Sequence, residues 1–309
     1  MERARGYPDR EIAQQPAFRA GFVNIIGRPN VGKSTLLNAL VGQKISIVTP
    51  KAQTTRHRIL GILNGPNYQI VFSDTPGIIR PAYRMQNAMM QFVKQAVDDA
   101  DVLMYMTDVR IINREDPNAV RKWMRVKTPF FFLINKIDLS EEQQVRQWVD
   151  TWQTYLPTAR IFPISALHRA GVEGIIPAVV ENLPHHPPYF EMQQVTDRSE
   201  RFLISEMIRE KIFQYLHQEV PYSTEVVVRR MAENERGVVE IDAEIFVNRS
   251  SQKPILIGKK GRRLKQIGEE SRKEIERILG QPVYLRTYVK VREGWRENPR
   301  YLRQFGYEG

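Results

Sequence analysis

The segment GRPNVGKST, residues 27–35, constrains the fold more than any other part of the chain, because it lies between an apolar run and a helix-like run. Four residues separate Gly27 from Gly32, and Lys33 and Ser34 follow directly. This is the P-loop spacing, in which backbone N–H groups and the start of a helix surround phosphate groups. We therefore expect Lys33 to reach the β- and γ-phosphates of a nucleotide and the Ser34 hydroxyl to bind Mg²⁺. The residues expected to contact the nucleotide here are Gly27, Arg28, Pro29, Asn30, Val31, Gly32, Lys33, Ser34 and Thr35.

Strand-like and helix-like runs alternate from residue 20 to residue 183. Several of the strand-like runs are apolar on both faces, which is typical of parallel strands covered by helices on each side. The pattern predicts an α/β nucleotide-binding domain with a doubly wound, mostly parallel sheet. The predicted strands contain GFVNIIG, YQIVFSDTPG, DVLMYMTDV, FFFLINKID and ARIFPISAL.

The remainder of the chain predicts a second domain of α+β type. The proline-rich stretch NLPHHPP cannot hold a long helix or a central strand, and we interpret it as part of a linker. A long amphipathic helix, two antiparallel strands, a helix–Gly-x-x-Gly–helix unit and a final strand are predicted after it. The expected division is a flexible lead-in over 1–19, a nucleotide-binding domain over 20–183, a linker over 184–200 and the second domain over 201–309.

Guanine selection is indicated by NKID, residues 135–138, which ends a predicted strand. At this edge of the sheet, where ligands bind, the Asp138 carboxylate can accept hydrogen bonds from the N1–H and amino group of guanine, and adenine offers no matching pair of donors. Asn135 and Lys136 are expected to brace the loop and cover the base. The weaker motif SAL is expected to offer backbone N–H groups to the guanine oxygen, from Ser165, Ala166 and Leu167.

Two further segments are expected to sense the γ-phosphate. In DTPG, residues 74–77, Asp74 would hold a water molecule bound to Mg²⁺, and the Gly77 N–H would meet the γ-phosphate. In KAQTTRHR, a threonine would complete the Mg²⁺ shell and order the loop only in the triphosphate state, and we expect Thr55 rather than Thr54 to do so. The residues expected to act in catalysis are Lys33, Thr55 and Gly77, and those expected at Mg²⁺ are Ser34, Thr55 and Asp74.

The charge of the chain favours a polyanionic partner. The 309 residues carry a net charge of +11, which suits either nucleic acid or an acidic membrane surface. No apolar run is long enough to span a membrane, and the polar N-terminus lacks the apolar region of a signal peptide. The absence of cysteine excludes disulfides and thiolate metal sites. We expect a cytoplasmic monomer, and association with the inner face of the cell membrane stays open.

IGKKG, residues 257–261, matches the Gly-x-x-Gly loop with which KH domains clamp the backbone of single-stranded nucleic acid. No acidic residue lies between Lys253 and Lys265. The last segment mixes arginines with Trp295 and Tyr301, a composition that suits either RNA binding or an aromatic helix packed on its own domain. The expected RNA contacts are Gly258, Lys259, Lys260, Gly261, Arg262, Arg263, Lys265, Arg286, Lys290 and Arg292.

From about residue 20 onward, the ordered motifs resemble those of the Era family of GTPases; they are GRPNVGKS, TTR, DTPG, NKID, SAL, EMIREKIFQYLHQEVPYSTEV, ILIGKKG and VKVREGWRENPRYLRQFGY. The resemblance implies an α/β P-loop GTPase domain followed by an α+β type II KH domain. It implies GTP, GDP and Mg²⁺ as ligands, hydrolysis of GTP to GDP and phosphate, and binding to the single-stranded 3′ end of small-subunit ribosomal RNA. A role in assembly of the small ribosomal subunit follows from the same resemblance.

Two positions bear on how hydrolysis would proceed. Ras-type GTPases place a water-orienting glutamine after the DxxG glycine, but this chain has Ile78 followed by Ile79, so we expect slow intrinsic hydrolysis or another group that replaces the glutamine. The resemblance suggests K⁺ held by Asn30, although Asn30 equally suits a loop residue that satisfies its own backbone. Two other functions stay open, namely a peripheral membrane-associated regulatory GTPase and an RNA-binding module whose nucleotide is only structural.

Overall fold

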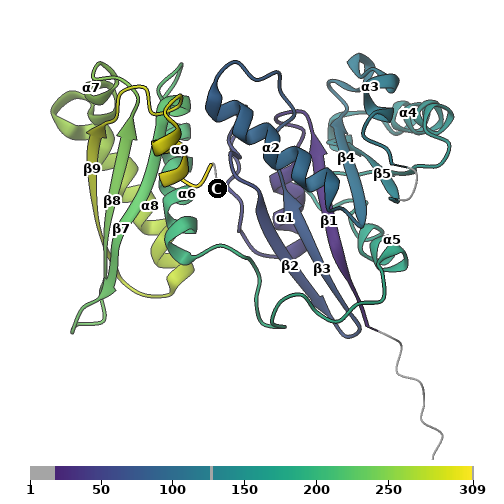
Figure 1. Cartoon of the computed structure of the whole chain (residues 1–309), viewed down its shortest axis with the longest axis horizontal. Coiled ribbons are helices and arrows are strands. Elements are labelled where there is room, and N and C mark those ends of the chain that lie inside the picture. The colour runs from purple at the N-terminus through teal and green to yellow at the C-terminus, as the bar shows by residue number, and fades with distance from the viewer. Residues whose placement is uncertain (1–17, 126–127, 308–309) are drawn as a thin grey trace, which may run out of the picture.

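The computed structural model describes residues 18–125 and 128–307, which form two sheets with their own helices (Figure 1). The expected lead-in over 1–19 lies almost wholly outside the described residues. The N-terminal sheet has six strands in the order β2-β3-β1-β4-β5-β6, and β3, β1, β4, β5 and β6 run parallel, which confirms the predicted sheet. The strands are β1 (Arg19–Gly27), β2 (Ile59–Gly65), β3 (Tyr68–Asp74), β4 (Val102–Asp108), β5 (Phe130–Asn135) and β6 (Arg160–Pro163).

Helices cover both faces of this sheet. Successive side chains of a strand point to opposite faces, and because both sets are apolar here, each face must be covered. On one face, α1 and α5 enclose an apolar cluster that includes Ile25 and Leu133. On the other face, α2, α3 and α4 enclose a second cluster, in which Phe132 and Trp152 stack with ring centroids 4.4 Å apart. The helices are α1 (Lys33–Val41), α2 (Arg84–Asp98), α3 (Pro117–Arg121), α4 (Glu142–Tyr155) and α5 (Ile175–Asn182), with short 3₁₀ turns at Ile112–Arg114 and Ile137–Leu139.

Strand β2 is an addition that the sequence pattern did not reveal. It pairs antiparallel with β3 through a tight turn after Gly65 and forms the edge of the sheet. The predicted linker runs along this edge, where Ile62 N–H donates to Val195 O at 2.9 Å and the Thr196 hydroxyl donates to Leu60 O at 2.7 Å. The chain between the two domains is therefore fixed to the first domain, and it covers a strand edge that would otherwise be open.

The C-terminal domain has the predicted α+β order. Strands β7 and β8 pair antiparallel, and β9 adds parallel to β8, in the order β7-β8-β9. Its core contains Ile208 of α6, Ile241 of β8, Leu256 of α7 and Ile267 of α8. The elements are α6 (Glu200–Tyr215), β7 (Thr224–Glu233), β8 (Val239–Val247), α7 (Gln252–Ile257), α8 (Arg262–Leu279), β9 (Val283–Val291) and α9 (Pro299–Gln304), with short 3₁₀ turns at Pro221–Ser223 and Lys259–Gly261.

Helix α6 differs from the amphipathic helix that we expected. Its apolar residues pack in the C-terminal core, but Glu206, Arg209 and Glu210 are buried as well, so its polar side does not face solvent. The physical reason is tertiary: this side of α6 contacts the loop between α1 and β2 of the first domain. The expectation of an amphipathic helix is therefore wrong here, because buried charged residues occupy the side of α6 that faces the first domain.

The C-terminal segment packs between the two domains. Trp295 is fully buried, and its Nε1–H donates to Ser223 O at 3.0 Å. It belongs to an apolar cluster that joins Met85 and Met89 of α2 to Phe246 of β8 and Phe305. The structure thus assigns Trp295 to packing, the second of the two roles that its composition suggested, and its ring is not available to stack on a base.

Candidate functional site

The P-loop lies at the carboxyl edge of the N-terminal sheet, between the end of β1 and the start of α1. It borders a cleft of about 420 Å³. Glycine is required at Gly32, because its φ is 107° and a Cβ there would lie 2.2 Å from Asn135 Nδ2. The cleft is lined by Pro29, Asn30, Gly32, Lys33, Ser34, Thr35, Ile47, Val48, Thr49, Pro50, Gln53, Thr54, Thr55, Thr75, Gly77, Arg110, Asn135, Lys136, Asp138, Leu139, Ser165 and Leu167.

Lys33 is buried inside the P-loop. Its ammonium group donates to Gly27 O at 3.1 Å and to Arg28 O at 2.9 Å. Burial lowers the pKa of Lys33 to about 8, although the nearby Asp74 carboxylate raises it. The lysine is therefore held among backbone carbonyls, and a phosphate group in the cleft would supply the negative charge that restores its usual protonation.

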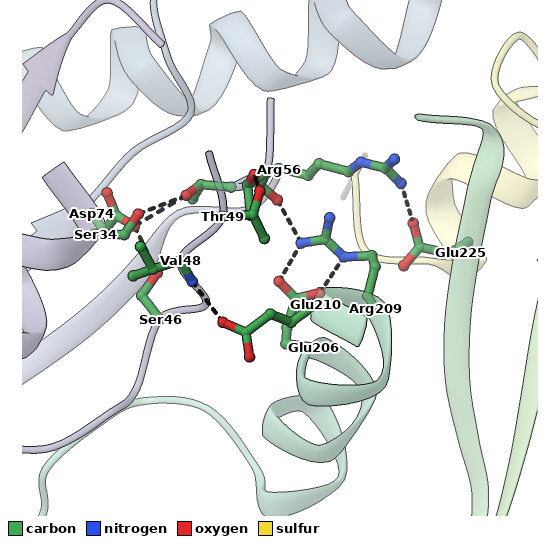
Figure 2. A network of polar contacts seen from close by, with 12 residues as sticks. Ser34, Ser46, Val48, Thr49, Arg56, Asp74, Glu206, Arg209, Glu210 and Glu225 are labelled. Atoms are coloured by element: carbon green, nitrogen blue, oxygen red, sulfur yellow. Dashed lines mark hydrogen bonds and ion pairs between the residues drawn. The ribbon is translucent and has the colours of Figure 1, made fainter. Parts of the chain in front are cut away.

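Three oxygen-bearing side chains meet beside Lys33, from α1, β3 and the loop that precedes β2. The Ser34 hydroxyl donates to Asp74 Oδ2 at 2.6 Å (Figure 2). Thr55 Oγ1 lies 2.9 Å from the Ser34 hydroxyl and 3.2 Å from Asp74 Oδ2. Burial raises the pKa of Asp74, although Lys33 and the hydroxyl groups lower it. Among the described residues, the buried Asp74 Oδ1 has no hydrogen-bond partner. Hydroxyl and carboxylate oxygens with one such open atom fit a Mg²⁺ ion.

The two candidate threonines lie in different surroundings. Thr54 Oγ1 donates to Lys51 O at 2.8 Å and contacts the Thr49 hydroxyl, so it closes a local turn. Thr55 Oγ1 joins the Ser34–Asp74 cluster. Ser46 also belongs to this cluster, since its hydroxyl donates to Asp74 Oδ2 at 2.7 Å. Sequence analysis missed Ser46, because no motif marks it in the loop after α1.

The loop that follows β5 is tied to both the P-loop and the SAL segment. Asn135 Nδ2 donates to Val31 O at 2.7 Å, and Asn135 Oδ1 accepts from the Ala166 N–H at 2.9 Å. Lys136 has a positive φ of 64° and donates to Asn30 O at 2.5 Å. These bonds bring three segments that are far apart in the sequence to one end of the cleft.

Asp138 is exposed at this end of the cleft, where a base would enter. Its Oδ1 accepts a hydrogen bond from the Ser165 hydroxyl, and Leu167 is exposed beside it on the rim. Asp108, at the end of β4, forms an ion pair with Lys136. The sequence analysis did not single out Asp108, although its place at the carboxyl end of a parallel strand was a signal for it.

The DTPG segment lies against the P-loop. A Cβ at Gly77 would lie 2.7 Å from Pro29 Cα, and the next N–H, that of Ile78, donates to Gly27 O at 2.9 Å. Ile78 packs against the apolar cluster of α2 and α4, so it brings no polar atom to the cleft. Ile78, which occupies the position of the Ras-type glutamine, is therefore held by its backbone N–H, and its side chain packs in the apolar cluster.

Three P-loop residues have side chains with other partners. The Arg28 guanidinium pairs with buried Glu115 at 3.1 Å, and the Val31 side chain is buried in the core. Asn30 is exposed with a positive φ of 65°, and its amide donates to Pro50 O at 3.0 Å. This bond joins the P-loop to the loop before β2. Asn30 thus does not use its side chain to satisfy its own backbone, which was one of the two roles considered for it.

The Gly-x-x-Gly loop connects α7 to α8, as predicted. Gly258 and Gly261 have φ of 73° and 76°, and Lys260 also has a positive φ of 52°. The loop borders a groove of about 450 Å³ between α8 and β9, which Lys265 and Tyr284 also line. The exposed basic side chains around the loop are those of Lys259, Lys260, Arg262, Arg263 and Lys265.

The other three residues expected to bind RNA do not line this groove, although the Arg286 guanidinium lies 5.5 Å from the ring centroid of Tyr284, which does. Arg286 pairs with Asp242 at 2.5 Å, and Lys290 pairs with Glu244. Arg292 lies over the rings of Phe246 and Tyr301. Lys290 and Arg292 are thus held by partners outside the groove, whereas Arg286 lies against a residue that lines it.

Across residues 18–125 and 128–307, no helix is both long and apolar enough to cross a membrane. A family model described as 50S ribosome-binding GTPase matches residues 22–136, and a KH domain model matches residues 219–296. The GTPase Era of Lactobacillus helveticus (strain DPC 4571) is 41% identical over 295 residues, which cover 96% of this chain and 98% of that protein. The GTPase Era of Leuconostoc citreum (strain KM20) is 43% identical over 296 residues, which cover 95% and 98%.

Two solved structures resemble this one along nearly its whole length. One is Era in complex with MgGDPNP and nucleotides 1506–1542 of 16S ribosomal RNA, and the other is a point variant of Aquifex aeolicus Era bound to GDP·AlF₄⁻. Each is 40% identical to this chain with a TM-score of 0.90, and each comparison covers 94% of this chain and 100% of the other. This chain belongs to the Era family of GTPases.

Proposed function

We propose that this protein binds GTP with Mg²⁺, hydrolyses GTP to GDP and phosphate, and uses the two nucleotide states to control binding to the 3′ region of small-subunit ribosomal RNA during assembly of the small subunit. The observation that carries the proposal is the cluster of Ser34, Thr55 and Asp74 beside Lys33, in a cleft whose far end is lined by Asn135 and Asp138.

Within this proposal, Ser34 and Thr55 hold Mg²⁺ directly and Asp74 holds it through water. The ion would neutralise charge that develops on the phosphate oxygens. Lys33 binds the β- and γ-phosphates, which replace the two carbonyls that its ammonium group contacts. The Gly77 N–H, held against Pro29, donates to the γ-phosphate and loses this partner after hydrolysis.

Guanine is selected at the opposite end of the cleft. The Asp138 carboxylate accepts from the base, the SAL backbone donates to its oxygen, and the Lys136 stem and Leu167 cover its faces. Asn135 keeps these parts in register, because both ends of its amide are already bonded to Val31 and Ala166. Selection rests on the cost of leaving buried polar groups without partners when the wrong base binds.

This site has no glutamine after Gly77 to position the attacking water. Ile78 has no polar atom, so intrinsic hydrolysis is proposed to be slow. K⁺ beside the phosphates, with Asn30 as a ligand, is the candidate that replaces the missing function. Asn30 lies on the cleft between the P-loop and Pro50, which supports this placement.

The RNA site is proposed at the Gly-x-x-Gly loop and the groove between α8 and β9. The glycines allow close approach of the RNA backbone, and Lys259 and Lys260 supply charge for its phosphates. The related Era structure with nucleotides 1506–1542 of 16S ribosomal RNA supports RNA of this kind as the partner. A ribosomal partner implies a cytoplasmic location. The peripheral membrane alternative has no support in the descriptions of these relatives.

The proposed division of the chain is a nucleotide domain over 20–183, a linker over 184–200 and an RNA-binding domain over 201–309. The linker contacts along β2 and the start of α6 at Glu200 support it.

The test combines chemistry with RNA binding. Single-turnover hydrolysis of GTP is compared with that of ATP in the wild type, and Lys33→Ala and Ile78→Ala are measured beside it. We expect no measurable hydrolysis for Lys33→Ala and a much smaller change for Ile78→Ala, because only Lys33 contributes a charge. RNA with the 3′-terminal sequence of the small-subunit RNA is then titrated against a shuffled RNA of equal length. A wild type that hydrolyses ATP as fast as GTP, or binds both RNAs equally, would refute the proposal.

A further inference from the structure

The loop between α1 and β2 contributes Thr55 to the cleft, but the C-terminal domain holds the residues on both sides of it. Before Thr55, the Thr54 carbonyl accepts a hydrogen bond from Arg209 Nη2 at 2.6 Å. After it, Arg56 donates to Thr224 O at 2.6 Å and to Glu225 Oε2 at 3.2 Å. In Figure 2 the Arg56 guanidinium points to Glu225 and Arg209 lies beside Glu206, with Ser34 and Asp74 at the other end of the same network.

The groups that make these bonds are shielded from water. Arg209 and Glu206 are both buried, and Arg209 Nε donates to Glu206 Oε1 at 2.7 Å. One edge of the guanidinium therefore binds its own helix while Nη2 also reaches the Thr54 carbonyl. On the other side, Glu225 is fixed by the Tyr307 hydroxyl, which donates to Oε2 at 2.6 Å. Charge-assisted hydrogen bonds are strong in such dry surroundings.

Helix α6 also holds the same loop further from Thr55. Glu210 Oε1 accepts from the Val48 N–H at 3.0 Å, and Glu210 Oε2 pairs with Lys44 at 2.6 Å. The Lys51 ammonium donates to the carbonyls of Phe213 and Leu216 at the end of α6. As the structure describes it, the stretch from 42 to 58 has no helix or strand of its own. The contacts with α6 therefore add to the bonds that this loop makes within its own domain, such as those of Ile45 and Ser46 N–H to Asn38 Oδ1.

We propose that Arg209, in the RNA-binding domain, is a positioning residue for the GTPase site, which fixes the peptide between Thr54 and Thr55 so that the Thr55 hydroxyl faces Mg²⁺ and the γ-phosphate. The inference rests on the proposed function of the cleft.

The physical reason is the entropy of the loop. Ordering an irregular segment opposes nucleotide binding unless other contacts have ordered it already. Thr55 is needed only when the γ-phosphate and Mg²⁺ are both present, so its positioning favours GTP over GDP. By linkage, a ligand that shifts α6 relative to this loop must change GTP affinity more than GDP affinity.

The informative variant is Arg209→Lys. Lysine keeps a positive charge next to Glu206, but it lacks the planar fork that reaches Glu206 and the Thr54 carbonyl together. The control is Arg229→Lys on β7, an exposed arginine whose Nε pairs with Glu244 Oε2 at 2.8 Å. Full-length proteins are compared for GTP-analogue and GDP affinity at fixed Mg²⁺, for thermal unfolding, and for hydrogen exchange over residues 44–58 without nucleotide.

We expect Arg209→Lys to lose affinity for the GTP analogue by about tenfold, the loss of one hydrogen bond to a charged donor, with GDP affinity near wild type. Amide exchange over the loop should accelerate without nucleotide or metal, while Arg229→Lys changes neither quantity. A purely structural role predicts equal losses for both nucleotides. An unchanged ratio of GTP-analogue to GDP affinity in a folded Arg209→Lys protein overturns the inference.

A second variant covers the case in which Arg209→Lys does not fold. Glu225→Gln preserves shape and the Tyr307 contact but removes the charge opposite Arg56, so it should shift the same affinity ratio in the same direction. Where Arg209→Lys does not fold, an unchanged ratio in this variant overturns the inference. If the wild type itself fails to hydrolyse GTP, the proposed function fails. If the wild type hydrolyses GTP and the folded test variant keeps its ratio, only the inference fails.

Discussion

Lys33 is expected to take up a proton when the nucleotide binds, and the structure sets the size of the effect. Without nucleotide, burial lowers the pKa of Lys33 to about 8, whereas the triphosphate supplies negative charge that raises it again. At pH 8 about half of the lysine is neutral, so binding should take up about half a proton per nucleotide, against about a tenth at pH 7. Affinity should therefore fall as pH rises through 8, by about fourfold between pH 7 and pH 8.5.

The assay is isothermal titration of a non-hydrolysable GTP analogue, at each pH in two buffers with different ionisation enthalpies. The difference between the two observed heats gives the number of protons taken up. Folding stability depends on pH with the opposite sign, because the pKa of Lys33 is lower in the folded chain than in the unfolded chain. This group costs stability below pH 8 and ceases to do so as pH rises toward 10.5, so loss of affinity at high pH is distinguishable from unfolding.

Lys33→Ala is the control, measured at a protein concentration high enough to detect its weaker binding. Its proton uptake at pH 8 should be close to zero. Wild-type protein that takes up no proton at pH 8, or an alanine variant with the same uptake as wild type, would show that the buried lysine is not the group that meets the phosphates.

Three other predictions follow from the site. Asp138→Asn should weaken GTP binding by about 10²-fold or more and improve binding of xanthosine triphosphate, since the amide now offers a donor to the base; competition titrations with both nucleotides measure this, and retained guanine preference would contradict it. Replacing K⁺ with Na⁺ at matched ionic strength should slow turnover if Asn30 holds a cation, and equal rates in both salts would remove the cation from the mechanism. Changing Lys259 and Lys260 together to alanine should weaken RNA binding and lower the salt slope by about 1.4 at most, with GTP hydrolysis in the absence of RNA and thermal stability both near wild type; an unchanged slope would make the loop a structural turn.

Much of the nucleotide site was predictable because its residues belong to short motifs with a fixed spacing in the sequence. The residues from Gly27 to Ser34 form a glycine-rich turn before a helix, and the backbone N–H groups of such a turn bind an anion. NKID and DTPG each follow an apolar strand, and the carboxyl ends of parallel strands meet at one edge of the sheet. The sequence therefore predicts that these two motifs converge at that edge. Ser46 joined the cluster without a motif, because a loop without regular structure gives no periodic signal.

The tertiary structure decided the features that depend on contacts between distant segments. Strand β2 was missed because ILGILNG is short and apolar, and only pairing with β3 gives it an edge position. From the composition of its segment, Trp295 could either stack on RNA or pack in the protein. Only the contact between α2 and β8 buries it in the cluster between the two domains.

The sequence by itself determined the P-loop fold, the preference for guanine and the presence of a Gly-x-x-Gly unit, since each depends on residues a few positions apart. Only the tertiary structure determines that charged residues of α6 are buried. Glu206, Arg209 and Glu210 have the composition of a solvated helix face, but they are buried because the loop that carries Thr55 lies across them. The burial of a charged side chain depends on what packs against it, and here that partner lies more than a hundred residues earlier in the chain.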